Sequence, residues 1–265
     1  MERWDDKIEE GSINPILHFL VLSCVFIDLA VLILKETSRG TLLEESIRQI
    51  AIWALPVLIA VVFHEVAHGW VAYQLGDSTA ARLGRLTLNP FAHVDLFGTI
   101  LVPLILIVSN APFVFGYAKP VPVNFSNLRN PKRDMIWVAA AGPAMNLLLA
   151  FFCAIAWRFL APGIGDHGEQ SGASRLSDYT AALVLMAQSG ILINIVLAVF
   201  NMLPLPPLDG GRVMVGLLPR TLSMSLARLE PYGFIILIVL LMTHTLDRII
   251  DPPTEFLLRI YLGAR

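Results

Sequence analysis

Long apolar segments alternate with short polar ones along this chain. A helix of about 20 apolar residues is long enough to cross the roughly 30 Å hydrocarbon core of a bilayer. Segments of this length predict five membrane-spanning helices, at Pro15 to Leu34, Ile50 to Leu75, Met135 to Leu160, Thr180 to Leu203 and Tyr232 to Ile249. The pattern therefore predicts an all-α polytopic membrane protein.

A further apolar stretch begins at Leu96, but it is short and is interrupted by Gly98, Pro103 and Pro112. Irregular backbone at membrane depth is tolerated only where protein or a wet cavity surrounds it. We therefore expect five to six transmembrane helices, with a re-entrant or irregular segment near 96–124.

Composition agrees with this class and excludes others. Of the 265 residues, 56% are hydrophobic and 15% are charged, and the mean hydropathy is +0.69, as in membrane proteins. The polar stretches are too short for a second soluble domain, so we predict a single membrane-embedded domain over 1–265. The net charge is −2 and the Lys and Arg residues are scattered, so we expect contact with the lipid bilayer and none with nucleic acid.

The second predicted helix contains three ionisable residues, His64, Glu65 and His68. Ionisable residues within a span are costly to bury and usually functional. Histidines four residues apart lie on one face of a helix, and in His-Glu-x-x-His they bind zinc while the glutamate acts as general base. The pattern also occurs by chance in soluble proteins, but without a metal it would be expensive inside a span. We therefore predict a Zn²⁺ site here.

A catalytic zinc normally has three protein ligands and a water, so a third ligand is expected elsewhere. Asp209 is the best candidate, because it follows three prolines after the fourth predicted helix, where freed backbone would line a polar cavity. Asn201, just before the prolines, could donate a side-chain hydrogen bond near the metal. Taken alone, the segment is more typical of a proline-rich loop that ends in a turn aspartate.

Together, these two patterns resemble the site-2 protease family of intramembrane zinc metalloproteases. The resemblance covers about Val57 to Leu217 and extends to three further motifs, at Gly84 to Pro90, Ala118 to Asn124 and Ala141 to Asn146. We therefore expect a catalytic core at about 50–217. Relatives often carry a PDZ or CBS domain, for which this chain has no room, so a compact form is expected.

The resemblance implies that His64, His68 and Asp209 bind the zinc. It further implies that Glu65 activates a water molecule and that Asn201 supports the oxyanion. The expected activity is zinc-dependent hydrolysis of peptide bonds in membrane-anchored proteins, with a single-span membrane protein as substrate. The sequence does not predict the oligomeric state.

Two alternatives belong to other functional classes. A metal-dependent membrane transporter would also place histidine, aspartate and broken helices at mid-membrane. It would leave Glu65 and Asn201 without a task, and it predicts an inverted repeat that the sequence lacks. A metal-binding membrane protein without catalytic activity is disfavoured by the presence of Glu65.

Two further polar residues are candidate substrate contacts. His93 lies near the expected mouth of the site, although an interfacial histidine bonded to backbone is the commoner arrangement. Asn146 follows Gly142 by one helical turn, so it could face the cavity or serve helix packing alone.

The orientation in the membrane depends on the irregular segment. If residues 96–117 return to the face that they left, the zinc motifs share one face of the membrane. More than half of the 19 Lys and Arg residues then lie on that face. The positive-inside rule thus predicts a multi-pass protein of the cell membrane, plasma or inner, with its active site towards the cytoplasm.

Overall fold

The computed structural model describes residues 42–93, 95, 101, 105, 119–161 and 174–263. Within these ranges all regular secondary structure is helical. Four helical segments are long and apolar enough to cross a membrane, namely Ile52–Gln74, Pro131–Leu160, Tyr179–Asn201 and Arg220–Met242. The all-helical, multi-pass class is therefore confirmed, and the span count stands at four in the described part. The predicted helix at Pro15 to Leu34 lies outside the described residues.

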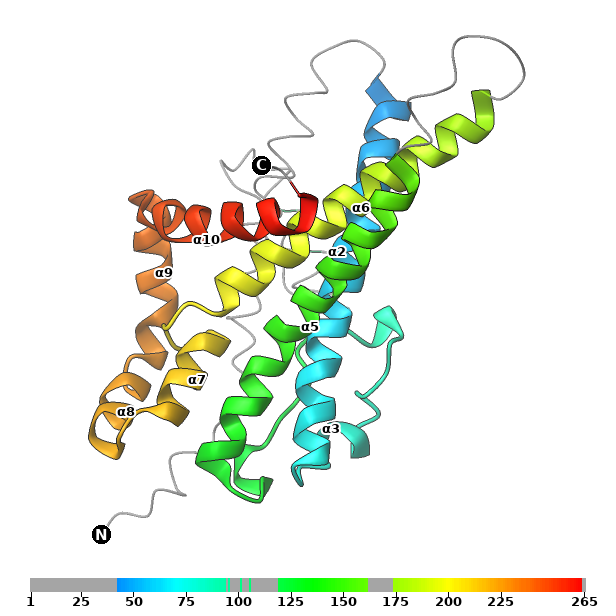
Figure 1. The fold of residues 1–265 in the computed structure, drawn as a ribbon. Coiled ribbons are helices and arrows are strands. Elements are labelled where there is room, and N and C mark those ends of the chain that lie inside the picture. Colours follow the sequence, from blue (N-terminus) through cyan, green and yellow to red (C-terminus); the bar gives the residue numbers. More distant parts are fainter. Residues whose placement is uncertain are drawn as a thin grey trace.

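Three long helices, α2 (Leu42–Gln74), α5 (Pro131–Leu160) and α6 (Ser174–Asn201), lie side by side (Figure 1). Between α5 and α6 the buried contact includes two alanines, Ala150 and Ala154, which pack against Ile191 and Ile195. Small residues let helix backbones approach closely in a membrane, where burial of apolar surface drives little association. This close packing brings the polar residues of the three helices within reach of one another.

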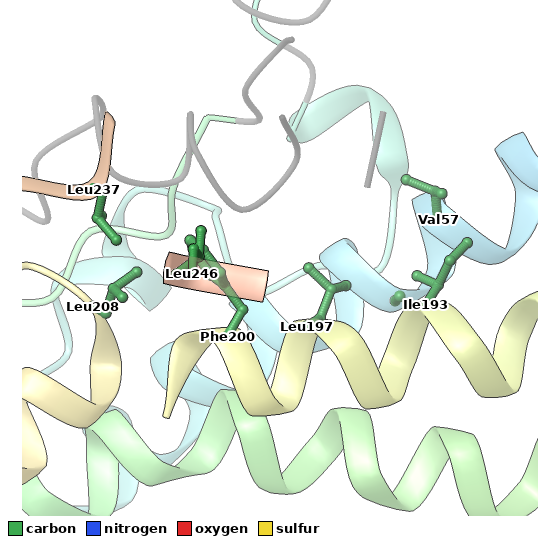
Figure 2. Packing of buried hydrophobic residues seen from close by; sticks show 8 residues of the cluster. Val57, Ile193, Leu197, Phe200, Leu208, Leu237 and Leu246 are labelled. Carbon is green, nitrogen blue, oxygen red and sulfur yellow. The ribbon is translucent and has the colours of Figure 1, made fainter. Parts of the chain in front are cut away.

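After α6 the chain changes direction several times. Prolines at 204, 206 and 207 cannot continue a helix, and the chain forms α7 (Asp209–Leu217), α8 (Arg220–Ala227), η6 (Glu230–Tyr232) and α9 (Gly233–Met242). Neither α7 nor α8 is predicted by the pattern of apolar segments. Leu208, Leu237 and Leu246 pack with Phe200 of α6 in one buried cluster (Figure 2). This cluster holds the C-terminal helices against the bundle.

The fifth predicted helix, Tyr232 to Ile249, has the wrong bounds. The helix α9 ends at Met242, and His244 has a left-handed backbone with φ of 53°. After it, α10 (Thr245–Leu262) lies across the bundle (Figure 1). Five charged residues of α10 are exposed, at Asp247, Arg248, Asp251, Glu255 and Arg259. A helix with so many exposed charges cannot continue a span, so the chain turns.

The connection between α2 and α5 contains the segment predicted to be irregular. It begins with α3 (Thr79–Arg82) and η2 (Pro90–Ala92) and ends with η4 (Phe125–Asn127), while residues 119–124 form no regular structure. The Lys119 N–H donates to the His93 carbonyl at 2.8 Å. The Arg85 guanidinium donates to the Lys119 carbonyl at 2.7 Å and also to that of Ala92. His93 and Lys119, on either side of residues 94–118, therefore lie next to each other. Of residues 96–117, only 101 and 105 are described.

Asp77 ties the loop after α2 to the loop before α5. Its carboxylate accepts hydrogen bonds from the Asn124 backbone N–H at 2.7 Å, from the Asn127 side chain at 2.9 Å and from Thr79. Burial by itself would raise the pKa of Asp77, but the hydrogen bonds from Asn127, Thr79 and Asn124 outweigh burial and hold the pKa below its usual value. The ionised carboxylate therefore organises this loop.

Candidate metal centre

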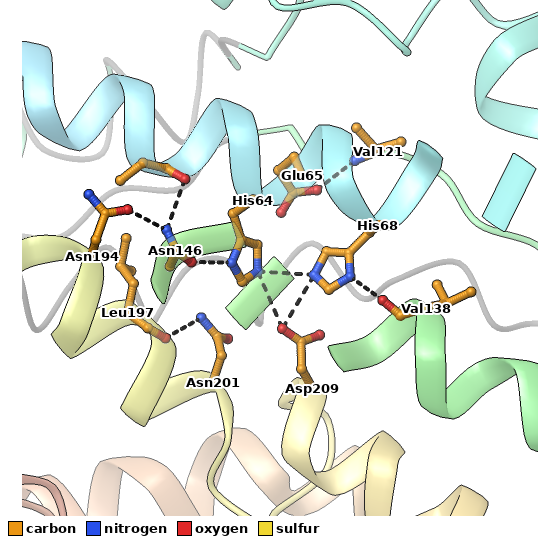
Figure 3. A network of polar contacts seen from close by, with 11 residues as sticks. His64, Glu65, His68, Val121, Val138, Asn146, Asn194, Leu197, Asn201 and Asp209 are labelled. Atoms are coloured by element: carbon orange, nitrogen blue, oxygen red, sulfur yellow. Dashed lines mark hydrogen bonds and ion pairs between the residues drawn. The ribbon is translucent and has the colours of Figure 1, made fainter. Parts of the chain in front are cut away.

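The two histidines of α2 lie on one face of the helix, as their spacing predicts. His64 and His68 are 4% and 2% exposed, and their Nε2 atoms are 3.0 Å apart (Figure 3). Gly142 of α5 packs directly against both rings, because a Cβ at this position would lie 2.3 Å from His68 Nε2 and 2.6 Å from His64 Nε2. The absent side chain leaves space in front of the two nitrogen atoms.

Asp209, the first residue of α7, lies opposite the histidines. Its Oδ2 is 3.3 Å from His64 Nε2 and 3.3 Å from His68 Nε2. Two glycines permit this position: a Cβ at Gly210 would lie 2.2 Å from the Met202 carbonyl oxygen, and a Cβ at Gly211 would meet the backbone of the proline loop equally closely. Only glycines allow the first turn of α7 to dock on this loop, and the docking brings Asp209 to the histidines.

Hydrogen bonds determine which ring nitrogen of each histidine carries a proton. His64 Nδ1 lies 2.5 Å from Asn146 Oδ1, and His68 Nδ1 lies 2.6 Å from the Val138 carbonyl oxygen. A carbonyl oxygen only accepts, so His68 Nδ1 is the donor, and the amide oxygen of Asn146 assigns the same role to His64 Nδ1. In the neutral rings, both Nε2 atoms are then unprotonated acceptors.

Three acceptor atoms therefore meet at one point, which is unfavourable without a cation. His64 Nε2, His68 Nε2 and Asp209 Oδ2 are within 4.8 Å of one another, and Asp209 Oδ2 has no hydrogen-bond donor. Ligands about 2.0 to 2.1 Å from a tetrahedral zinc lie about 3.4 Å apart. The observed separations of 3.0, 3.3 and 3.3 Å are close to this value. The three residues thus fit a zinc ion with one further position open.

Glu65 projects from α2 beside the two histidines (Figure 3) and is 0% exposed. The backbone N–H of Val121 donates to Glu65 Oε2 at 2.8 Å. The segment 119–124 that follows the irregular region therefore passes next to this carboxylate. The residues on either side of Val121 are prolines at 120 and 122, which have no N–H, so Val121 provides the backbone donor among these three residues.

Three further residues were predicted for the site, Asn201, Asn146 and His93, and they differ in what they contact. Asn201 ends α6 beside Asp209 (Figure 3) and donates one side-chain N–H to the Leu197 carbonyl at 3.0 Å. Asn146 is fully buried and bonded to protein groups, so this structure does not place it where substrate could touch it. His93 is 2% exposed, its Nε2 donates to the Thr87 carbonyl at 2.8 Å, and it is not in the group of three metal-ligating atoms.

Sequence reasoning missed Asn194. This residue of α6 is 2% exposed and bonds to Asn146. Its position in an apolar span and its spacing of seven residues from Asn201, two turns of helix, were signals that could have identified it.

Comparisons with known proteins agree with this geometry. The chain matches the peptidase family M50 over residues 52–244, which extends beyond the predicted core. Two bacterial relatives are each named "putative zinc metalloprotease". YwhC of Bacillus subtilis is 39% identical over 71% of this chain and 79% of its own length, and Rip2 of Mycolicibacterium smegmatis is 28% identical over 72% and 66%. No solved structure matches the chain at a significant level.

These matches give no support to the transporter or to a metal-binding protein without activity. The matched region contains the two histidines, the glutamate and the aspartate that meet in the structure. The chain therefore belongs to peptidase family M50, the site-2 protease family, and is a zinc-dependent intramembrane metalloprotease.

Proposed function

We propose that the protein cuts single-span membrane proteins at a zinc ion held by His64, His68 and Asp209. The observation that carries this proposal is the meeting of three buried acceptor atoms, with separations of 3.0 to 3.3 Å, beside the carboxylate of Glu65. When bound, zinc lowers the pKa of a water molecule and polarises the scissile carbonyl. The same ligands could hold a structural metal, but a fourth protein ligand is absent from the described residues around them.

Glu65 has the role of general base in this proposal. It takes a proton from the attacking water and passes it to the nitrogen atom that leaves when the peptide bond breaks. The hydrogen bond from the Val121 N–H to Glu65 Oε2 holds the carboxylate in one orientation. That bond also links the general base to the irregular segment 119–124, along which an unwound substrate strand could lie.

Asn201 has the role of oxyanion donor. A side-chain amide carries two N–H groups, and the bond to the Leu197 carbonyl uses one of them. The second N–H is the donor proposed for the developing oxyanion, which a positioned donor typically stabilises by about 3 kcal/mol. Asn201→Asp removes this donor at nearly constant shape and should lower the rate of cleavage more than the affinity for zinc.

The decisive variant is Glu65→Gln, because the amide keeps the shape of the carboxylate and removes the base. Purified full-length protein in nanodiscs, incubated with a single-span test protein, should lose about 10²- to 10⁴-fold in cleavage rate and keep its zinc. Glu255→Gln, at an exposed glutamate of α10, is the matched control and should cleave normally. A loss of less than about tenfold for Glu65→Gln would refute the general-base role.

We also propose that residues 96–117 re-enter the membrane and that the active site faces the cytoplasm. The hydrogen bond between Lys119 and His93 supports re-entry, because it brings the two ends of the segment together. Single cysteines at Ser78 and Ser126, in a chain without Cys24 and Cys153, should both react with an impermeant reagent from the cytoplasmic side. A third cysteine at Glu255 of α10 should react from the opposite side.

The labelling pattern decides between the alternatives. Reaction of Ser78→Cys and Ser126→Cys from opposite sides would mean that 96–117 crosses the membrane as a further span. Reaction of both from the outside would reverse the proposed orientation and leave re-entry intact.

A further inference from the structure

A chain of buried side-chain amides leads from the zinc site into α6. His64 Nδ1 contacts Asn146 Oδ1 at 2.5 Å, and Asn146 Nδ2 lies 2.8 Å from Asn194 Oδ1 and 3.2 Å from the Ala60 carbonyl. Asn194 Nδ2 in turn lies 2.8 Å from the Gly190 carbonyl. The chain thus joins α2, α5 and α6 through His64, Asn146 and Asn194 (Figure 3), and it ends at the carbonyls of Ala60 and Gly190.

The two carbonyls determine the direction of every hydrogen bond in the chain. A backbone carbonyl can only accept, so Asn194 must turn its NH₂ group towards Gly190 and its oxygen towards Asn146. Asn146 must then turn its NH₂ group towards Asn194 and Ala60, which leaves its oxygen facing His64. That oxygen is an acceptor, so the proton of neutral His64 resides on Nδ1 and Nε2 is unprotonated. A flip of either amide would set two oxygens against each other, and burial would make that costly.

We propose that Asn194 is a positioning residue that, acting through Asn146, fixes the ring orientation and the tautomer of His64 for zinc binding. This inference rests on the proposed role of His64 as a zinc ligand. Ligating histidines generally donate their second ring N–H to an oxygen acceptor, and loss of such partners typically costs about 10- to 100-fold in metal affinity. Here the acceptor is itself oriented by a residue of a third helix, at 2% exposure.

A plain structural role predicts a different outcome. Asn146 and Asn194 could simply hold α5 and α6 together, since hydrogen bonds between helices stabilise membrane bundles by roughly 1 kcal/mol. In that case their removal would lower the stability of the protein and leave the intrinsic affinity for zinc unchanged. Zinc affinity and thermal stability, measured on the same variants, separate the two roles without any assay of cleavage.

The test measures the zinc dissociation constant of the full-length protein by competition with a chromophoric chelator, and uses the Co²⁺ absorption spectrum as a signature of ligand geometry. Asn194→Leu should weaken zinc binding by about tenfold, because the Nδ2 group of Asn146 then keeps only its longer hydrogen bond, to the Ala60 carbonyl, and orients the Asn146 oxygen less firmly towards His64. Asn194→Asp should restore affinity to within about threefold, since a buried neutral carboxylic acid offers the same acceptor and donor. Ser189→Ala, at a buried serine of α6 outside the chain of amides, is the control and should bind like the wild type.

The double variant gives the sharpest result. Asn194 acts through Asn146, so Asn194→Leu should have no further effect on zinc affinity in an Asn146→Leu background. Losses that multiply in the double variant, or wild-type affinity and an unchanged Co²⁺ spectrum in Asn194→Leu, would overturn the proposal. Failure of the wild-type protein to bind zinc would instead refute the proposed metal site, so the two failures are distinguishable.

Discussion

Gly142 of α5 offers a prediction whose size follows from the structure. A Cβ added by Gly142→Ala would lie 2.3 Å from His68 Nε2 and 2.6 Å from His64 Nε2. Ordinary van der Waals contact begins at 3.4 Å, so the two nitrogen atoms would have to move by about 1.1 and 0.8 Å. Zinc sites tolerate ligand distances only within about 0.2 Å of their usual values. The substitution should therefore displace both histidine ligands, or the added methyl group should occupy the zinc position itself.

The expected loss of zinc affinity is at least about 100-fold. This is the upper end of the loss that follows when only a hydrogen-bond partner of a ligand is removed, and Gly142→Ala displaces the ligands themselves. Helix propensity by itself predicts that Gly142→Ala stabilises the protein, because alanine favours a helix over glycine by about 1 kcal/mol. Helix content measured by circular dichroism should therefore be unchanged in Gly142→Ala while bound zinc and cleavage are lost.

Zinc content by mass spectrometry and cleavage of a single-span test protein are the assays. Ala144→Val, two residues further along α5 on its exposed side, is the matched control and should keep both. Full zinc content together with full cleavage in Gly142→Ala would refute the described packing of α5 against the histidines.

Asp209→Ala should lower zinc occupancy strongly, because two protein ligands hold a catalytic zinc poorly; unchanged occupancy and cleavage would exclude Asp209 as a ligand. Asp77→Asn should lower the melting temperature at pH 7. The pKa of Asp77 is lower in the folded protein than in the unfolded chain, so the ionised carboxylate stabilises the fold above the unfolded pKa of about 3.9. This stabilisation is lost as pH falls through the folded pKa. A difference in melting temperature between variant and wild type that persists at still lower pH would contradict this. Arg212→Leu should lower the melting temperature more than Glu230→Gln. Both variants lose the half-exposed ion pair between Arg212 and Glu230, worth at most about 1 kcal/mol, but only Arg212→Leu also loses the stacking of a guanidinium, in a residue that is 8% exposed, 5.2 Å from the centre of the Phe125 ring. Equal melting temperatures of the two variants would show that this stacking contributes nothing.

Much of the site could be predicted from the sequence because two of the three ligands, His64 and His68, are close together in the chain. Helical periodicity alone places His64 and His68 on one face of the helix. Their position in an apolar span indicates a metal, because ionisable residues there are costly to bury without one. The same reasoning about apolar length located the ends of α2, α5 and α6 to within two residues, but it placed their starts four to eight residues too late. It failed at Tyr232 to Ile249, because the length of an apolar run does not reveal the turn at His244 or the amphipathic helix α10 that follows.

Tertiary structure decided everything that joins one helix to another. Asp209 reaches the histidines because Gly210 and Gly211 dock on the proline loop, and Asn146 meets His64 across 82 positions of sequence. Asn194 and the space at Gly142 depend in the same way on how closely α2, α5 and α6 pack. Periodicity specifies which side chains share a face of one helix, but not which face of another helix they meet, because that choice depends on the combined shape and polarity of all the surfaces in contact.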